Sequence, residues 1–417
     1  MTESYVIIGD GIAGGSAAKT LREESPDADI TVITDEGETL YNRILIKEYA
    51  KGKIPMEDPL FLHDEEWYEE RDIDLELNTH VTHIDPDGHV VHTHEGDDYE
   101  YDALLVATGG TPRQLPVDNS DADGVHHFWT FEDARSIADH AEESEQGIVV
   151  GAGLLGIDFA AICGARGIEA NYLMRGDCWW RYALSEDGAG IIHDALRELD
   201  VEPVFQSGVD HFVTDDDGHV TGAVDPNGEE FEGEFVGVSI GLDFNTEFLR
   251  GSGIETDDGI VVDEFMETNT EDIYAAGDIT RFYDVILEEH AQNGSWDSAK
   301  KQGAVAAKNM TAADGEAEEF RHVSSYSISH FKDLPFVSFG HPTIGDDDRE
   351  RKYSDTEWRR LTFKNGKLIG GVLIGNLKLQ SAFKRIIREE RDLEGQKDLL
   401  IEEDFEMEML DAAAQEQ

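Results

Sequence analysis

The feature that most constrains this chain is one glycine pattern that occurs twice. YVIIGDGIAGGSAAKTLREESPDADITVITDE near the start and GIVVGAGLLGIDFAAICGARGIEANYLMRGD from Gly147 each predict a strand, a glycine-rich turn, a helix and a strand. The turn residues of the two copies are Gly9, Gly11, Ala13 and Gly14, and Gly151, Gly153, Leu155 and Gly156. Glycine is needed because the turn is tight, the backbone approaches a pyrophosphate closely, and the helix packs closely on the strand. The repeat therefore predicts two Rossmann turns, each of which binds a dinucleotide.

The charge of the chain narrows its possible partners. There are 33 Lys and Arg residues against 92 Asp and Glu residues, a formal net charge of −59. Such a chain repels nucleic acid and anionic lipid, so neither is expected as a partner. The acidic residues alternate with apolar runs such as ALLVATGG and LIGGVLIG, which predicts folded domains. A dispersed acidic surface resembles that of halophilic proteins, since the Debye length falls to about 3 Å in 1 M salt. Ordinary acidity is the alternative.

Cysteine content and hydropathy indicate a soluble cytoplasmic protein. Cys163 and Cys178 are the only two cysteines, and the chain opens directly on the strand-like run SYVIIG. We therefore expect no export signal and no structural disulfide. No window approaches the roughly 18 apolar residues of a membrane-spanning helix.

The segments outside the repeat predict further strands. HVTHIDPDGHVVHTHEGDDYEYD reads as a β-meander, and its five histidines from His80 to His94 alternate with apolar residues. Exposed strand positions explain them better than a metal site, so no metal is expected. From about Ser324 to Asp392, YSIS, FVSFG, WRRLTF and KLIGGVLIG predict strands and LQSAFKRIIREERD predicts a helix. We expect the final stretch to be frayed or loosely docked.

Two further motifs identify a family resemblance. LLVATGG contains Thr108 and Gly109, and TNTEDIYAAGDIT contains Gly277 and Asp278. Together with the two glycine turns, in this order, they resemble the FAD-dependent pyridine nucleotide reductases of the glutathione-reductase-like class. The resemblance implies that Asp278 contacts the ribityl chain of FAD. By itself, an Asp at this point would more often cap the next helix.

The same resemblance implies an α/β fold with a discontinuous first domain. Two Rossmann-like dinucleotide-binding domains of the three-layer ββα type are expected, followed by a small α+β C-terminal domain. The implied FAD-binding domain comprises 1–117 and 233–313, and the NAD(P)-binding domain, 118–232, is inserted within it. The C-terminal domain comprises 318–400, and an acidic tail comprises 401–417. In this class the C-terminal domain helps to form a dimer or to cover the flavin, so a homodimer is possible.

The absence of cysteine from one segment excludes the thiol-dependent members of this class. Thiol-dependent members carry redox cysteines on the segment after the first unit, which here reads ETLYNRILIKEYAKGK without cysteine. The chain then resembles rubredoxin and ferredoxin reductases and the flavin-binding half of assimilatory nitrite reductases. YNRILIKEYAKG is similar to their Y-x-R-x-x-L-S-K segment, which implies a FAD contact by Arg43. A Lys beneath the flavin pairs in that group with an acid, here Asp158. Lys47 is one residue nearer Arg43 than that pattern expects, and Glu48 stands at the expected position.

The run WDSAKKQG resembles the W-x-x-A-x-x-Q-G motif of the same group. The similarity implies that Trp296 and Gln302 lie near the isoalloxazine.

The residue that follows the second strand of each Rossmann copy indicates which nucleotide is bound. An acid there accepts hydrogen bonds from a ribose 2′-hydroxyl, whereas an arginine accommodates a 2′-phosphate. Asp35 and Glu36 follow the first copy, about 20 residues after its last glycine, as expected for FAD. Arg175 follows the second copy, and Arg181 has a spacing seen in NADPH-using glutathione reductases. NADPH is therefore favoured over NADH, although Asp177 is placed to restore NADH binding.

These features predict an NAD(P)H-dependent flavoprotein reductase. Hydride passes from the nicotinamide to FAD, and the electrons leave to an external acceptor such as ferredoxin or rubredoxin. Two alternatives stay open at this point. One is a flavin-binding redox sensor or scaffold, and the other is the flavoprotein component of a nitrite-reductase-like system.

Overall fold

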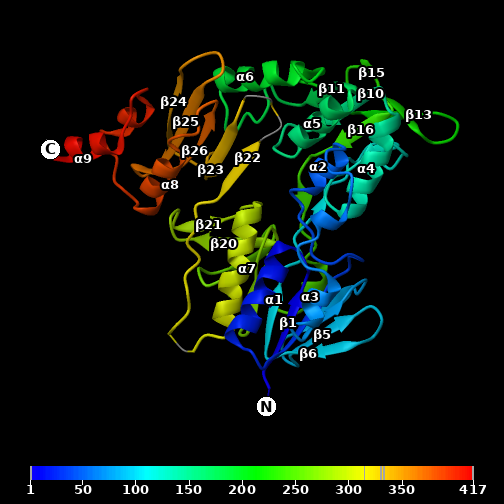
Figure 1. The fold of residues 1–417 in the computed structure, drawn as a ribbon, viewed down its shortest axis with the longest axis vertical. Coiled ribbons are helices and arrows are strands. Elements are labelled where there is room, and N and C mark those ends of the chain that lie inside the picture. Colours follow the sequence, from blue (N-terminus) through cyan, green and yellow to red (C-terminus); the bar gives the residue numbers. More distant parts are fainter. Residues whose placement is uncertain (1, 314, 329–330, 332–333, 416–417) are drawn as a thin grey trace. The chain divides into compact units, whose positions relative to one another are not determined.

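The computed structural model describes residues 2–313, 315–328, 331 and 334–415. They form two compact units, each made of three stretches of chain (Figure 1). The first unit comprises Met1–Leu45, Met56–Thr111 and Leu242–Ser324. The second unit comprises Ile46–Pro55, Pro112–Gly241 and Ser325–Gln417.

A five-stranded parallel sheet forms the centre of the first unit, in the order β19-β7-β1-β2-β3. Its strands are β1 (Ser4–Ile8), β2 (Asp29–Ile33), β3 (Ile73–Glu76), β7 (Ala103–Val106) and β19 (Ile273–Ala275). Strand β7 is buried along its whole length, which explains why ALLV is an unbroken apolar run. Strand β19 comes from the last stretch of the unit, so the returning chain completes this sheet.

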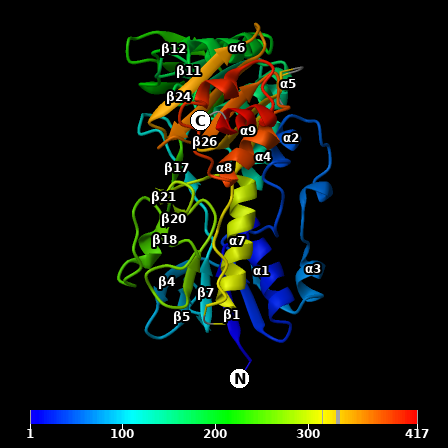
Figure 2. The same cartoon turned by 90° about the vertical axis from the view of Figure 1, so that its left-hand side faces the viewer.

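Two helices lie side by side in the first unit, α1 (Ile12–Glu24) and α7 (Trp296–Met310) (Figure 2). Their approach is close, because a Cβ on Gly303 would lie 2.0 Å from the carbonyl oxygen of Ala13. The smaller elements of the unit are η1 (Asp58–Leu60), α3 (Glu65–Glu69), β4 (Val81–Asp85), β5 (Val90–Thr93), β6 (Asp98–Glu100), β17 (Leu242–Asp243), η2 (Glu247–Leu249), β18 (Ile260–Val262), β20 (Thr280–Asp284) and β21 (Glu289–Ala291). Strands β4, β5 and β6 form the predicted meander.

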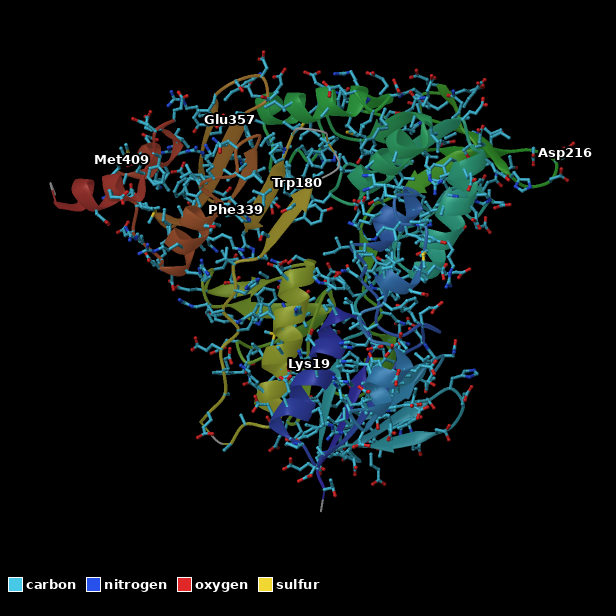
Figure 3. All side chains as sticks on the ribbon, in the orientation of Figure 1. Lys19, Trp180, Asp216, Phe339, Glu357 and Met409 are labelled. Atoms are coloured by element: carbon cyan, nitrogen blue, oxygen red, sulfur yellow. The ribbon has the colours of Figure 1, made fainter. Side chains whose placement is uncertain are left out.

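The second unit contains a second five-stranded parallel sheet, in the order β12-β11-β10-β16-β9. Its strands are β9 (Val125–His126), β10 (Gln146–Val150), β11 (Glu169–Met174), β12 (Val201–Phe205) and β16 (Phe235–Val238). The helices of this part are α2 (Ile46–Ala50), α4 (Phe131–Glu143), α5 (Gly156–Arg166) and α6 (Glu186–Arg197). Strand β8 (Thr111–Pro112) and the hairpins of β13 (His211–Thr214), β14 (Val220–Val224) and β15 (Glu230–Glu232) complete it. Asp216, at the exposed tip between β13 and β14, exemplifies the acidic surface (Figure 3).

An antiparallel sheet in the order β22-β23-β26-β25-β24 forms the C-terminal part of the second unit. Its strands are β22 (Ser325–Ile328), β23 (Phe336–Gly340), β24 (Asp347–Lys352), β25 (Trp358–Lys364) and β26 (Lys367–Ile374). The four predicted strands and the predicted helix, α8 (Gln380–Arg388), are confirmed. Strand β24 was not predicted because its sequence, DDRERK, is entirely charged. Such a sequence suits an edge strand, which must avoid pairing with other chains.

Aromatic residues join the C-terminal sheet to the rest of the second unit. Trp358 of β25 is buried against Gly188 of α6, where an added Cβ would lie 2.8 Å from the indole. The ring of Phe336 lies 5.9 Å from that of Trp179 and 6.1 Å from that of Trp180, which Figure 3 labels. This shared core makes the C-terminal sheet part of one compact unit.

The expectation of a frayed chain end is wrong for its apolar residues. After η3 (Lys397–Ile401), Phe405 and Leu410 are buried, and the ring of Phe405 stacks 5.8 Å from that of Phe383 on α8. Helix α9 (Met407–Gln415) follows. Most residues of this stretch are polar or acidic, so its composition does not predict that a few apolar side chains are buried.

The predicted fold class is confirmed, with two parallel dinucleotide-binding sheets and a C-terminal α+β part. The three-domain division predicted from the sequence stays a proposal. No helix in the described ranges is both long and apolar enough to cross a lipid bilayer.

Candidate functional site: two glycine turns

The first glycine turn joins β1 to α1 in the first unit. Gly9 has φ +103°, and a Cβ there would lie 2.5 Å from the oxygen of Ala107. A Cβ on Gly14 would lie 1.9 Å from the oxygen of Gly9, so both positions require glycine for the fold itself. Gly11 differs, because a Cβ there would meet nothing within 4 Å. Gly11 also begins α1 without a side-chain cap, so the helix N-terminus is open to an anion.

The two acidic residues that follow β2, Asp35 and Glu36, have different surroundings. Asp35 is exposed, whereas Glu36 accepts a hydrogen bond of 2.6 Å from the Tyr41 hydroxyl and forms an ion pair with Arg43. Glu36 and Arg43, which the sequence predicted only as separate FAD contacts, pair with each other and form one charged cluster with Tyr41, whose ring lies 4.9 Å from the guanidinium carbon.

Asp278 lies near Arg43 in the same unit. Burial raises the pKa of the Asp278 carboxyl to about 6, and the opposing effect of the Arg43 charge is smaller. Within the described residues, no hydrogen bond to this carboxylate is found, so it is available to accept one from a ligand hydroxyl. The open Gly11 and this acceptor fit FAD, since the cofactor offers a pyrophosphate and a ribityl chain.

Other predicted contacts hold the turn together. The side-chain oxygen of Gln302 accepts hydrogen bonds from the Gly277 N–H, at 2.7 Å, and from the Thr280 hydroxyl, at 3.1 Å. Gln302 is fully buried and therefore fixes the Gly277 turn, whose φ is +87°. Trp296 is half-buried at the start of α7.

The ATG segment lies beside the first turn. Thr108 is exposed after β7, and its backbone nitrogen would lie 3.1 Å from a Cβ on Gly9. Gly109 follows with φ +62°, a backbone conformation that favours glycine.

The second glycine turn, in the second unit, repeats the geometry of the first. Gly151 has φ +114°, and a Cβ there would lie 1.9 Å from the oxygen of Ser239. Gly153 is open, with nothing within 4 Å of an added Cβ. A Cβ on Gly156 would lie 2.0 Å from the Tyr172 hydroxyl, which is buried and has no hydrogen-bond partner within the described residues. Leu155 immediately precedes α5. The open position at Gly153 fits a second dinucleotide.

Lys47 and Asp158 form a buried ion pair near this turn. Lys47 Nζ lies 2.6 Å from Asp158 Oδ2, and the Asp158 side chain is 1% exposed. Glu48 instead pairs with Lys51 and Lys53. The structure therefore brings the two predicted residues together despite the shortened spacing.

Tyr326 of β22 was missed by the sequence analysis and lies beside the same pair. Its ring centroid is 5.8 Å from Lys47 Nζ, and its hydroxyl donates to the Leu154 oxygen at 3.4 Å. Burial, followed by the charge of Asp158, raises the pKa of Tyr326 well above its ordinary value, so this phenol stays protonated. No sequence motif indicated Tyr326 as a site residue, because β22 is far along the chain from both glycine motifs.

Arg175 and Arg181 are exposed after β11. Arg181 donates a hydrogen bond of 3.1 Å to the hydroxyl of Tyr182, a neighbour that the sequence analysis missed. Hydrogen bonding to Arg181 and its charge, with a smaller effect of Arg175, lower the pKa of Tyr182. Both arginines therefore contribute positive potential at the strand end where a ribose substituent is read.

The cysteines occupy structural positions. Cys163 is buried within α5, where burial raises the pKa of its thiol to about 12. Burial, with the nearby Asp177, also raises the pKa of Cys178. Neither thiol is activated as a nucleophile. Within the described part of the chain, no group of three or more His, Cys, Asp or Glu residues is arranged to hold a metal ion.

Two glycine turns, each open at its second glycine, define a class of oxidoreductase that binds two dinucleotides. A family model described as pyridine nucleotide-disulphide oxidoreductase matches residues 3–303. The chain belongs to this family, as its motifs predicted. It is an NAD(P)H-dependent flavoprotein oxidoreductase that uses FAD and NAD(P)H.

Similar proteins support the same class. The NADH-rubredoxin oxidoreductase of Clostridium acetobutylicum is 26% identical over 386 residues, which cover 92% of this chain and 93% of that protein. The ferredoxin–NAD(+) reductase component of 3-phenylpropionate/cinnamic acid dioxygenase of Photorhabdus laumondii is 28% identical over 311 residues, which cover 74% and 77%. The crystal structure of a covalent putidaredoxin reductase–putidaredoxin complex contains a similar fold, with a TM-score of 0.91, 24% identity, and coverage of 100% of this chain and 99% of that one.

Proposed function

We propose that FAD binds at the first glycine turn, that NAD(P)H binds at the second, and that the electrons then leave to a small ferredoxin- or rubredoxin-type protein. The observation that carries this proposal is the pair of turns whose second glycines, Gly11 and Gly153, are open to a ligand. Two relatives named as a ferredoxin reductase component and a rubredoxin oxidoreductase support this kind of acceptor. The unactivated thiols of Cys163 and Cys178 argue against a final acceptor within the described chain.

When bound, FAD supplies the hydride-accepting chemistry, and the protein supplies binding and orientation. In this proposal the Asp278 carboxylate accepts a hydrogen bond from the ribityl chain and Arg43 neutralises nearby negative charge. Trp296 and Gln302 border the flavin by resemblance, with Gln302 holding the Gly277 turn. Lys47, Asp158 and Tyr326 form a rigid polar group at the second turn, and we propose that Lys47 and Asp158 position the reacting rings.

NADPH is the preferred donor in this proposal. Arg175 and Arg181 supply two positive charges where a 2′-phosphate would lie. Asp177 is exposed beside them and keeps NADH as the competing donor.

We further propose that the protein works in the cytoplasm of a halophile. Its net charge of −59 supports this, since concentrated salt screens the repulsion both within the chain and towards an acidic electron carrier. The same charge disfavours nucleic acid and membrane surfaces as partners. The proposal includes a homodimer, and size-exclusion chromatography with light scattering in molar salt would measure its mass.

Stopped-flow reduction tests the proposal. Purified protein in molar salt is mixed with NADPH or NADH, and the flavin absorbance is followed. We expect bleaching faster than about 1 s⁻¹ with at least one donor, since typical kcat values start near there. Reduction of purified ferredoxins and rubredoxins is then measured in the same buffer. Bleaching far slower than this with both donors would favour a redox sensor over an enzyme.

A further inference from the structure

Asp10 is a buried carboxyl group inside the first glycine turn, between Gly9 and Gly11. The residue is 8% exposed. Its Oδ1 and Oδ2 lie 2.7 and 2.8 Å from the hydroxyl of Tyr68, a fully enclosed residue of α3. The N–H of Leu40 also donates to this carboxyl. The motif residues proposed to bind FAD do not include Asp10, because the pattern leaves this position unspecified.

Burial dominates the ionisation of Asp10. It raises the pKa of the carboxyl to about 7, against the opposing effect of the hydrogen bonds from Tyr68 and Leu40. Two charged groups from the segment after β2 also act on it. Glu36 raises the pKa, and Arg43 lowers it. The free carboxyl is therefore about half ionised at neutral pH.

A pyrophosphate at this turn would add negative charge next to Asp10. Helix α1 begins immediately after Gly11, and its first N–H groups have no side-chain cap. A helix N-terminus carries only about half a positive charge, so it offsets only part of the negative charge of a pyrophosphate. Like charges at short range favour the neutral form of the group that can be protonated. The Tyr68 hydroxyl suits either form, because it both donates and accepts hydrogen bonds.

We propose that Asp10 belongs to the FAD site as a neutral carboxylic acid, and that FAD binding takes up one proton from solvent at this side chain. The inference rests on the proposed placement of FAD at the first glycine turn. In the binding reaction, the free protein with Asp10 ionised combines with one proton and one FAD to give the complex with Asp10 protonated. Above the pKa of the free carboxyl, FAD affinity therefore falls as the pH rises.

The test measures FAD affinity rather than turnover. Holoprotein at constant molar salt is equilibrated at pH 5.5 to 9 and ultrafiltered, and the free FAD is quantified by fluorescence. For the wild-type protein we expect a constant Kd below about pH 6.5 and a rise approaching tenfold per pH unit above about pH 7. Asp10→Asn removes the titration but keeps the shape and an acceptor for Tyr68, so its Kd should not change with pH.

Asp27→Asn is the matched control, because it removes one exposed carboxylate from the same unit. It should keep the wild-type slope. A flat wild-type profile, or an unchanged slope in Asp10→Asn, would overturn the inference.

Proton uptake in the wild-type protein gives a measurement that needs no variant at Asp10. Deflavinated protein is titrated calorimetrically with FAD at pH 8 in two buffers of different ionisation enthalpy. Uptake of more than about half a proton per FAD is expected, because the free carboxyl is mostly ionised at pH 8. Uptake of no proton would overturn the inference.

Gly11→Val separates this inference from the placement of FAD on which it rests. Its side chain would fill the open position, so FAD should be lost if it binds there. Loss of FAD by Gly11→Val together with a flat wild-type pH profile would refute the role of Asp10 alone. Tight FAD binding by Gly11→Val would contradict the placement, and with it the inference.

Discussion

Lys47 Nζ and Asp158 Oδ2 lie 2.6 Å apart, although 111 residues separate them in the chain. Lys47 is on the short helix α2 and Asp158 is in the first turn of α5. Consecutive residues of a helix point about 100° apart, so Lys47 and Glu48 face different neighbours. Glu48 turns to Lys51 and Lys53, which leaves Lys47 to neutralise the buried acid.

Loss of one partner from this pair should destabilise the second unit. Asp158→Ala or Lys47→Ala removes one half of a buried ion pair, and we expect a loss of about 3–5 kcal/mol in the free energy of unfolding. The double variant should recover part of that loss. Denaturant unfolding of the four proteins in a double-mutant cycle measures the coupling. Lys308 and Glu318 form an exposed pair, whose removal should cost at most about 1 kcal/mol. Equal losses for the two pairs would contradict the prediction.

Arg175→Asp should change the preferred donor. It removes a positive charge after β11 and supplies an acceptor for a ribose 2′-hydroxyl. Loss of one charge-assisted hydrogen bond, about 1.5–3 kcal/mol, predicts that the KM for NADPH rises about tenfold to a hundredfold and that the KM for NADH falls. Steady-state kinetics with both donors measures this. Arg197→Asp on α6 makes the same charge change at another exposed arginine and should leave the ratio unchanged. Unaltered NADPH affinity in Arg175→Asp would refute the argument.

The glycines of the second turn should separate binding from folding. A Cβ on Gly153 would meet nothing within 4 Å, so Gly153→Val should keep the unfolding free energy within about 0.5 kcal/mol while NAD(P)H binding is lost. Gly156→Ala would press against the Tyr172 hydroxyl and should cost about 1–3 kcal/mol. Thermal unfolding and nucleotide titration of both variants distinguish these effects. Equal destabilisation by the two substitutions would contradict the assignment of Gly153 as an open position and Gly156 as a packed one.

His126 should make the fold acid-sensitive. It is 6% exposed, and its Nε2 lies 2.9 Å from His140 Nδ1. Burial, and then the charge of His140, lower its pKa to about 3. The unfolded side chain titrates near its ordinary pKa of about 6.5, so its contribution to stability is present above that pH and is lost as the pH falls towards 3.

The expected loss from this histidine is about 2 kcal/mol between pH 6.5 and 4.5. His126→Phe should show a shallower pH dependence by that amount in denaturant unfolding. His290→Phe, at an exposed position, should keep the wild-type dependence. Parallel curves for the wild type and His126→Phe would exclude this role for His126.

The basic surface of α8 should contribute to binding of an acidic acceptor. The run NLKLQSAFKRIIR, 376–388, contains four basic residues and no acid in a chain of charge −59. Lys378, Arg385 and Arg388 are exposed, whereas Phe383 is buried beneath them. Changing these three basic residues to Gln should raise the KM for an acidic carrier about tenfold at moderate salt, with less effect at high salt.

Ferricyanide reduction provides the internal control, because a small acceptor does not need a protein-docking surface. It should be unchanged in the α8 variant. A triple Gln variant at Lys19, Lys53 and Lys308 removes the same charge elsewhere and should keep the wild-type KM. An equal effect of the two triple variants would attribute the change to net charge rather than to α8.

Much of the architecture could be predicted from local patterns. The strand, turn and helix of each glycine motif, and four of the five C-terminal strands, follow from apolar periodicity and turn residues. Strand β24 could not be predicted because its side chains are all charged. It forms a strand because it pairs with β25. The buried Phe405 and Leu410 escaped because two apolar residues in an acidic stretch give no periodic signal.

The sequence by itself determined where the two glycine turns lie, since a tight turn with a positive φ is a local requirement. It also determined the order of motifs that defines the family. Only the tertiary structure decided that Lys47 reaches Asp158, that Tyr172 abuts Gly156, and that Tyr326 lies beside the pair. These contacts depend on how separate elements pack, and local periodicity carries no information about which distant side chains that packing brings together.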